Sequence, residues 1–240
     1  MKNHFYLVLV ALLTMHGLTF AKQTQKEAVD VMSLPKFKEM TKDLSPQARF
    51  KTAAMMHIYL DQYEQAIPLL EVLVKKTPSD ATPWMLLAMA YNRNGQPQDA
   101  FETANIAITL KPAYTSFYME RGIAAFELGK DREAVKDLSG FLKSHTTNTE
   151  AYYYLGLAYA RLGELDAART SLLKTRSLNP NLALFTDYCL GLIAARQGKT
   201  QEAKVLLKET AAAFKDIKGS FQQEVRRQLK QVESQTKAKK

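Results

Sequence analysis

The chain has 240 residues, of which 46% are hydrophobic and 24% charged, a composition typical of a soluble protein with one or two domains. Its single cysteine, Cys189, excludes an internal disulfide and with it the class of small secreted proteins held together by disulfides. The formal net charge is +9, and the basic excess lies near the C-terminus: residues 199–240 carry 11 Lys and Arg against 5 Asp and Glu, whereas residues 81–182 carry 11 against 10.

Residues 1–21 have the order of a cleavable export signal. Lys2 gives a positive start, an apolar run spans residues 5–13, and small residues stand at the −3 and −1 positions of a cut after Ala21. The run is short for a membrane span, and His16 interrupts its extension. The chain also has no Asn-x-Ser/Thr site, which favours a bacterial envelope. We expect a periplasmic or secreted mature protein, with an uncleaved membrane anchor as the alternative.

The next segment, residues 22–46, shows no clear periodicity. Its stretches "KEAVDVM" and "PKFKEMTKDL" have the composition of short helices. We expect these helices to cover the first of the repeats that follow.

From residue 47 onward the sequence repeats itself every 34 residues. Aromatic, alanine, glycine and proline residues recur in register: Phe50, Trp84, Tyr118 and Tyr152; Ala66, Ala100, Ala134 and Ala168; Gly95, Gly129 and Gly163; and Pro78, Pro112 and Pro180. One extra residue near Ala183 shifts the last copy. The sequence thus predicts five copies, at residues 47–80, 81–114, 115–148, 149–182 and 184–217.

Each copy has the pattern of two helices joined by a tight turn. In the second copy one face of the first helix is formed by residues at i, i+3, i+4 and i+7, which are Trp84, Leu87, Ala88 and Tyr91. Gly95 supplies the turn, and small residues line the second helix, at Ala100, Ala104 and Ala107. Pro97 starts this second helix and Pro112 ends it.

Three positions depart from the pattern. Asp61 occupies the glycine position of the first copy, where Asp tolerates positive φ better than most residues. Thr146 replaces proline in the third copy, which predicts a looser junction there. Pro68 lies early in a second helix, and no internal hydrogen bond is lost if that helix begins near Glu64.

The pattern resembles the tetratricopeptide repeat, whose signature runs W-x2-L-G-x2-Y, then A-x3-F, then P. The copies that match it best contain Trp84, Leu87, Ala88, Tyr91, Gly95, Ala100 and Pro112, and Tyr152, Leu155, Gly156, Tyr159, Gly163, Ala168, Leu172 and Pro180. The resemblance implies an all-α fold, a right-handed superhelical solenoid of about five helical hairpins. It further implies a scaffold for protein interactions, and the signal makes the chain similar to exported bacterial adaptors of this family.

The remaining residues, 218–240, are predicted to form a capping helix and a basic tail. Phe221, Val225, Leu229 and Val232 make one apolar stripe, and Ser220 with Gln223 can form a capping box at its start. The opposite face carries Arg226, Arg227 and Lys230. A polar outer face is what the end of a solenoid needs. The last five residues, "TKAKK", are expected to be disordered.

In proteins of the resembled family, the first helices line a partner-binding groove. Carried onto this sequence, the groove positions give Met55, Tyr59, Met85, Met89, Arg93, Met119, Ile123, Tyr153, Leu157, Arg161, Tyr188, Leu192 and Arg196. The ninth position of every copy is apolar, which predicts a surface for an apolar or amphipathic segment, with arginines pairing acidic groups at one rim. The alternative is that this row packs between helices or under the N-terminal segment.

The same positions disfavour a co-chaperone clamp for a terminal carboxylate. That clamp needs Lys and Asn at the fifth and ninth positions, where this chain has Lys51 with Met55 and Met85 with Met89.

The sequence offers no set of residues for catalysis, a metal or a cofactor. His57 stands where other copies have tyrosine, which predicts a packed helix residue, and His145 lies in a polar junction. Because the tyrosines are explained as repeat core and the repeats are nearly charge-balanced, specific nucleic-acid binding is not expected. We therefore expect a non-enzymatic adaptor that binds other proteins or peptides, possible examples being components of envelope, secretion or pilus assembly. The alternative is a membrane-associated protein held by its N-terminus and basic tail.

Overall fold

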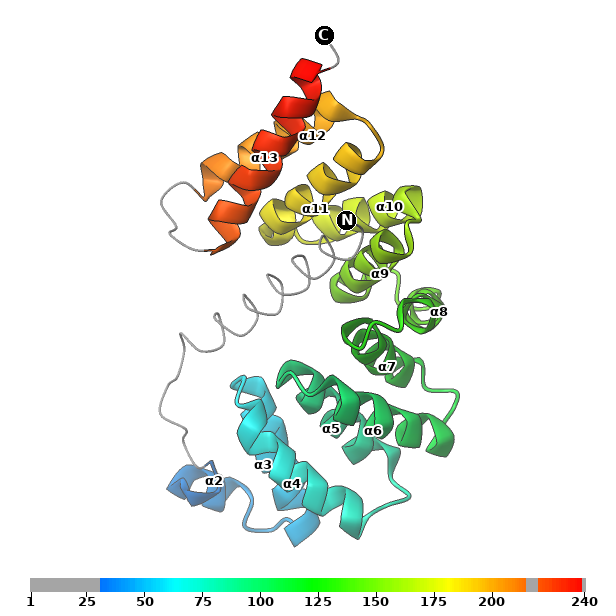
Figure 1. Ribbon diagram of the computed structural model, residues 1–240. Coiled ribbons are helices and arrows are strands. Elements are labelled where there is room, and N and C mark those ends of the chain that lie inside the picture. The colour runs from blue at the N-terminus through cyan, green and yellow to red at the C-terminus, as the bar shows by residue number, and fades with distance from the viewer. Residues whose placement is uncertain (1–30, 215–219, 239–240) are drawn as a thin grey trace. The chain divides into compact units, whose positions relative to one another are not determined.

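The computed structural model describes residues 31–214 and 220–238, and every regular element in these ranges is helical (Figure 1). The prediction of an all-α fold is confirmed. The predicted export signal lies outside the described residues, as does most of the "KEAVDVM" stretch. The chain divides into two compact units, residues 1–133 and 134–240.

The N-terminal unit begins with a short 3-10 helix and a short α-helix, followed by two complete hairpins and the first helix of a third. Its elements are η1 (Val31–Ser33), α2 (Pro35–Met40), α3 (Pro46–Tyr59), α4 (Tyr63–Lys76), α5 (Ala81–Arg93), α6 (Pro97–Leu110) and α7 (Thr115–Glu127). Within each hairpin the two helices pack together, and α4 then packs on α5 and α6 on α7. The α8 helix (Asp131–Leu142) begins at the division between the units.

The C-terminal unit contains two hairpins and a final long helix. After α8 its elements are α9 (Thr149–Leu162), α10 (Leu165–Leu178), η2 (Pro180–Leu182), α11 (Ala183–Arg196), α12 (Thr200–Ala213) and α13 (Ser220–Ala238). Here α9 packs on α10, α11 on α12, and α13 on α12. Each second helix ends before the proline position, although α8, whose copy has Thr146 there, is two residues shorter than the others.

The turn inside each hairpin is fixed by one residue with positive φ. These residues are Asp61, Gly95, Gly129, Gly163 and Gly198, with φ between 56° and 85°. In every copy the next residue donates its backbone N–H to a carbonyl five residues earlier, at 2.8 to 2.9 Å, as in a Schellman motif. The expectation for Asp61 is confirmed, because it adopts the left-handed conformation that glycine provides elsewhere.

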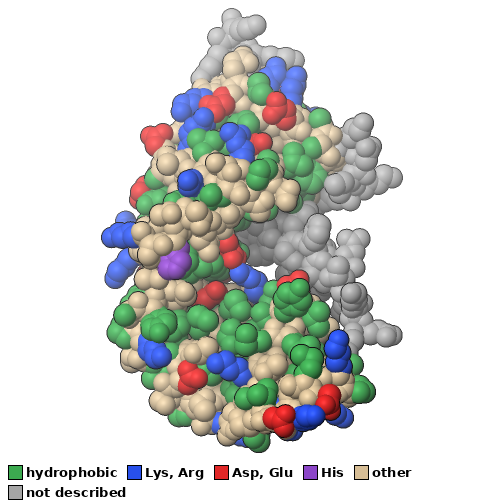
Figure 2. Space-filling view, turned by 180° about the vertical axis from the view of Figure 1, so that it is seen from behind, with side chains coloured by type: hydrophobic (Ala, Val, Ile, Leu, Met, Phe, Trp, Pro, Cys, Tyr) green, Lys and Arg blue, Asp and Glu red, His purple; other side chains and the backbone are tan. Residues whose placement is uncertain are grey.

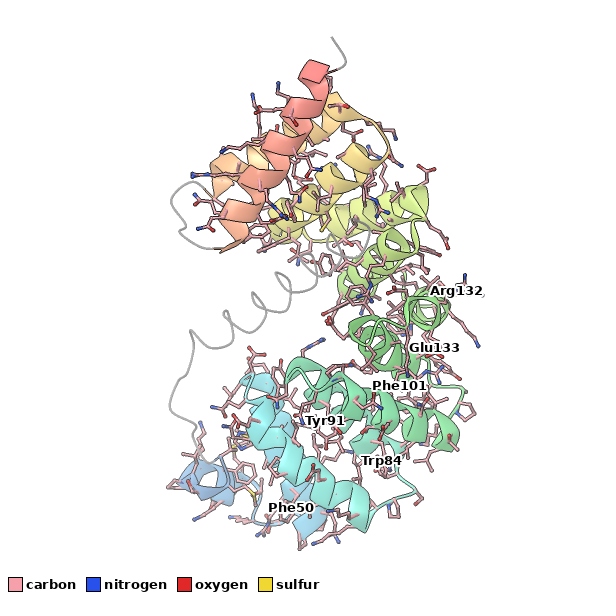
Figure 3. All side chains as sticks on the ribbon, in the orientation of Figure 1. Phe50, Trp84, Tyr91, Phe101, Arg132 and Glu133 are labelled. Carbon is pink, nitrogen blue, oxygen red and sulfur yellow. The ribbon has the colours of Figure 1, made fainter. Side chains whose placement is uncertain are left out.

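In two of the first helices, an aromatic residue near the start fastens the helix to the preceding turn. Trp84 Nε1 donates a hydrogen bond to the Pro78 carbonyl at 3.0 Å, and the Tyr118 hydroxyl donates to the Pro112 carbonyl at the same distance. Trp84 also packs against the core that joins α3, α4 and α5 (Figure 3). In the second and third copies the recurrence of aromatic and proline therefore corresponds to the same hydrogen bond.

The start of the described chain covers the first hairpin, as expected. Val31, Phe37 and Ala53 form a buried cluster against which Met56 packs. Arg49 of α3 donates from Nε to the Thr41 carbonyl at 2.8 Å. These contacts hold η1 and α2 against α3.

At the other end, α13 closes the last hairpin through an aromatic cluster. The Phe221 ring lies 5.0 Å from Phe214 and 5.1 Å from Tyr188, measured between centroids. Val225 and Val232 continue the buried stripe. The predicted capping helix is present, and its Arg226, Arg227 and Lys230 are exposed as expected.

Two details of the sequence interpretation are wrong. Because α4 begins at Tyr63, Pro68 is inside the helix, and its missing N–H deprives the Glu64 carbonyl of a partner. The tail was expected to be disordered from Thr236, but α13 continues through Ala238. The Ser220 side chain lies outside the description, so the proposed capping box stays a prediction.

Candidate functional site: the first-helix faces

The surface most suited to a partner lies on α3 in the N-terminal unit. Met55 and Tyr59 are one helical turn apart, and their side chains are 51% and 87% exposed. The opposite side of α3 is buried, with Ala53, Ala54 and His57 in the core. Spacing alone therefore places two large apolar side chains on the solvent side of a well-packed helix.

The α5 helix carries the next two predicted groove methionines, which are less exposed than Met55. Met85 and Met89 are half-buried and pack against the same core cluster as Ile58 of α3. Arg93, at the end of α5, is also half-buried. We call Met55, Tyr59, Met85 and Met89 the methionine face. In the space-filling view, hydrophobic side chains appear at the surface of the N-terminal unit in several separate groups (Figure 2).

Polar contacts fix the helices beside the methionine face. Asn92 Nδ2 donates to the backbone carbonyl and to Oε2 of Glu120, at 2.9 and 2.8 Å, which ties α5 to α7. The Tyr91 hydroxyl donates to Glu71 Oε1 at 2.8 Å. Burial of the phenol, followed by this carboxylate, raises the pKa of Tyr91 far above its usual range. Sequence reasoning missed both bonds, since a 34-residue repeat does not reveal which polar pairs meet.

On α7 the predicted groove residues are buried. Met119 and Ile123 are 8% and 2% exposed. They belong to the interior of the structure and do not extend the methionine face.

In the C-terminal unit three of the four apolar groove residues are buried too. Leu157 is 1% exposed, and Tyr188 and Leu192 are also buried, while Tyr153 is half-buried. Tyr188 is covered partly by Phe221 of the capping helix, and its pKa is raised by burial. The expected exposed apolar row is therefore wrong at Ile123, Leu157 and Leu192, where burial agrees with the alternative of a packed row.

The arginines of the predicted rim have different surroundings. Arg196 donates from one guanidinium nitrogen to the Ala160 carbonyl in the last turn of α9, at 2.9 Å. A cation at this position complements the helix dipole and satisfies an end carbonyl, which is a structural role. Arg93 and Arg161 are half-buried, each on the last turn of its own helix.

Of the His and Cys side chains in the described residues, His57 and Cys189 are buried and His145 is exposed. His57 is buried, as predicted, with Nδ1 2.8 Å from Gln62 Oε1. His145 is exposed but stacks on Phe141, with ring centroids 4.1 Å apart. Burial raises the pKa of the Cys189 thiol to about 12, so the thiolate is scarce at neutral pH. Within the described ranges no three His, Cys, Asp or Glu residues gather as metal ligands would.

The family comparison matches the repeats directly. A family model described as tetratricopeptide repeat matches residues 52–115 and 119–182. These ranges include more than half of the chain. The fifth hairpin, α11 with α12, lies outside the matched ranges and is recognised from the structure.

Among the relatives with curated descriptions, anaphase-promoting complex subunit 3 of Schizosaccharomyces pombe is 26% identical over 72% of this chain. Superkiller protein 3 of the same organism is 27% identical over 63% of it. The chain spans only 26% and 11% of the lengths of these relatives.

Solved structures share the fold. The MamA 41-end structure from Desulfovibrio magneticus RS-1 has a TM-score of 0.62 at 18% identity, covering 73% of this chain and 99% of its own. YrrB, described as a TPR protein with an unusual peptide-binding site, has a TM-score of 0.60 at 16% identity, covering 75% and 93%. At these identities the likeness concerns the fold alone.

Proposed function

Because this chain belongs to the tetratricopeptide repeat family, we propose that it is a non-enzymatic adaptor that binds an apolar or amphipathic segment of another protein on its methionine face. Proteins of this family serve as scaffolds for protein interactions, and the proposal assigns that role to particular residues. The observation that carries it is the exposure of Met55 and Tyr59 on the first helix of the first hairpin.

The chemistry of the face indicates what kind of segment fits. Methionine is flexible and polarizable, so it adapts to varied apolar shapes, and tyrosine adds a large ring with one polar end. Lys51 lies one turn before Met55 on the same helix, where it can meet a carboxylate of the partner. The expected partner is therefore a segment with bulky apolar side chains and an acidic edge.

The test uses affinity capture from the native cell with two matched variants. Met55→Glu combined with Tyr59→Glu places two charges on the methionine face, and we expect the captured partner to be lost. Ile106→Glu is the control, since Ile106 is an exposed apolar residue on α6, the second helix of its hairpin. Circular dichroism would show that both variants stay folded. A partner that binds the double variant as strongly as the wild type would exclude this face.

The cellular location forms part of the proposal. The order of residues in the first 21 positions favours export with cleavage after Ala21. N-terminal sequencing of protein purified from the native host tests this, and we expect a start at Lys22. A start at Met1 would favour the uncleaved anchor instead.

A second candidate function, association with a membrane surface, is favoured by the capping helix. Arg226 and Lys230 are exposed on α13, whose apolar stripe is used in packing, so any attraction would be electrostatic. No described helix is both long and apolar enough to cross a membrane. Sedimentation with vesicles containing anionic lipid, compared between the wild type and Arg226→Gln with Lys230→Gln, tests this candidate. Equal sedimentation of the two proteins would reject it.

A further inference from the structure

The methionines of this chain are distributed very unevenly. All seven that follow residue 30 lie in the N-terminal unit, and residues 134–240 contain none. They are Met32, Met40, Met55, Met56, Met85, Met89 and Met119. Only Met40 and Met55 are exposed, at 66% and 51%, whereas Met119 is 8% exposed and the others are half-buried.

We propose that Met55 is a reversible oxidation site, at which a peroxide-class oxidant weakens partner binding on the methionine face. In the reaction the thioether sulfur attacks one peroxide oxygen, the O–O bond breaks and an S–O bond forms. Sulfur is oxidised by two electrons to the sulfoxide, and the peroxide is reduced to water for hydrogen peroxide, or to an alcohol for an alkyl peroxide. The effect on binding rests on the proposed function, whereas the oxidation itself does not.

Packing makes Met55 the susceptible member of the face. Met85 and Met89 pack against the core cluster of α3, α4 and α5, and Met56 packs against the cluster around Val31. Contact with neighbouring side chains limits the approach of an oxidant to those sulfurs, while half of the Met55 side chain meets solvent. The chain has one thiol to compete for the oxidant, and Cys189 is buried.

Oxidation at Met55 changes what the face can bury. A sulfoxide is polar and accepts hydrogen bonds, so an apolar partner side chain would cover an unsatisfied oxygen. We expect oxidation to raise the dissociation constant of the partner by a factor of about ten or more. This is the cost of leaving one such polar group unsatisfied. Met40, at the end of α2, is more exposed but lies outside the methionine face. It should therefore oxidise without changing partner affinity.

The oxidation site is tested by mapping. The full-length protein would be treated with hydrogen peroxide for increasing times, digested, and analysed by mass spectrometry, with fragment ions separating Met55 from the adjacent Met56. Among the seven methionines that follow residue 30, we expect sulfoxide to accumulate first at Met40 and Met55 and last at Met119. Oxidation of Met55 at the same rate as Met119 would overturn the assignment, whatever the protein binds.

The effect on binding is tested with a defined probe, a fluorescein-labelled amphipathic peptide of Leu and Glu. Peroxide should weaken its binding to the wild type and to Met40→Leu, and leave Met55→Leu unchanged. Treatment with methionine sulfoxide reductase should restore the wild type. Equal weakening of Met55→Leu would overturn the role of Met55. Absence of binding before oxidation would count against the proposed function and the effect on binding together, while the mapping still decides the oxidation site.

Discussion

The first helices of the two units occupy the same repeat positions but present different side chains. In the N-terminal unit, ninth-position Met55 is exposed and Met89 half-buried, whereas in the C-terminal unit the equivalent Leu157 and Leu192 are buried. Ile123 on α7 of the N-terminal unit is buried as well, so one repeat plan gives an adaptable face on α3 and α5 and packed residues on α7, α9 and α11. A position within the repeat places a residue on a helix face, and its neighbours decide whether that face is free.

The contacts between the two helices of a hairpin also differ between the units. In α9, Gly156 faces Leu172 of α10, and a Cβ added at Gly156 would lie 2.8 Å from Leu172 Cγ. In the second hairpin the same two positions hold Ala88 and Ala104, which are both fully buried. The C-terminal hairpins thus combine a glycine with a large leucine, and the second hairpin combines two small residues.

The largest effect is expected when a buried residue of the C-terminal face is shortened. Leu157→Ala leaves a cavity and should lower the free energy of unfolding by about 2–5 kcal/mol. Met89→Ala, at the matching position of α5, removes a half-buried side chain and should cost clearly less. Urea denaturation followed by circular dichroism measures both losses. Equal losses would remove the distinction between a packed and an adaptable face.

A smaller loss of stability is expected when a side chain is added at Gly156. In Gly156→Ala the new Cβ would meet Leu172 and also approach the Ala168 carbonyl oxygen at 3.2 Å, so the helices must separate. Overpacking of this kind costs about 1–3 kcal/mol. The double variant Gly156→Ala with Leu172→Ala recreates the pairing of Ala88 with Ala104. The double variant should lose less stability than the two single variants lose in sum. Additive losses would argue against the contact.

The sequence was sufficient to predict the helices and their turns. The 34-residue period placed the turns at Gly95, Gly129 and Gly163, and identified Asp61 as a substitute for glycine, because the conformation of a turn depends on the residue that occupies it. The capping helix was predictable for a similar reason, since its apolar stripe recurs with helical spacing.

The candidate site was predictable only in part. Family positions identified Met55 and Tyr59, but the same positions included Leu157 and Tyr188, which are buried. Exposure depends on contacts between helices that are distant in sequence, such as that of Tyr188 with Phe221 of α13. The sequence does show that the methionines gather in one unit. This uneven distribution could have distinguished the exposed first-helix face from the buried one.

The N-terminal caps of α5 and α9 differ in charge, so their contributions to stability should depend differently on pH. The Asp80 carboxylate accepts a hydrogen bond from the Thr82 N–H at the start of α5, whereas the neutral Asn148 amide oxygen caps α9 at 2.8 Å from the Ala151 nitrogen. The Thr82 N–H lowers the pKa of Asp80. Either cap changed to alanine should cost about 1 kcal/mol at neutral pH.

The two cap variants should diverge in acid. A lowered pKa in the folded state means that the contribution of Asp80 is complete above its unfolded value of about 4 and is lost as the pH falls through the folded value. Urea midpoints measured between pH 7 and pH 2 should show the cost of Asp80→Ala decreasing, because the protonated carboxyl accepts the Thr82 N–H only as a neutral oxygen. The cost of Asn148→Ala should persist over the same range. Parallel curves would contradict a charged cap on α5.

The smallest effect on stability, and the most informative one for function, is expected at Met55. Because half of this side chain meets solvent, Met55→Ala should change the free energy of unfolding by no more than about 0.5 kcal/mol. A partner that covers the methionine face would lose its contacts with the thioether, so its affinity should fall although the fold is intact. Isothermal titration of the captured partner measures this difference, with Ile106→Ala, at a residue that is 41% exposed, as the control. Unchanged affinity in a stable Met55→Ala variant would mean that the partner does not bind at Met55.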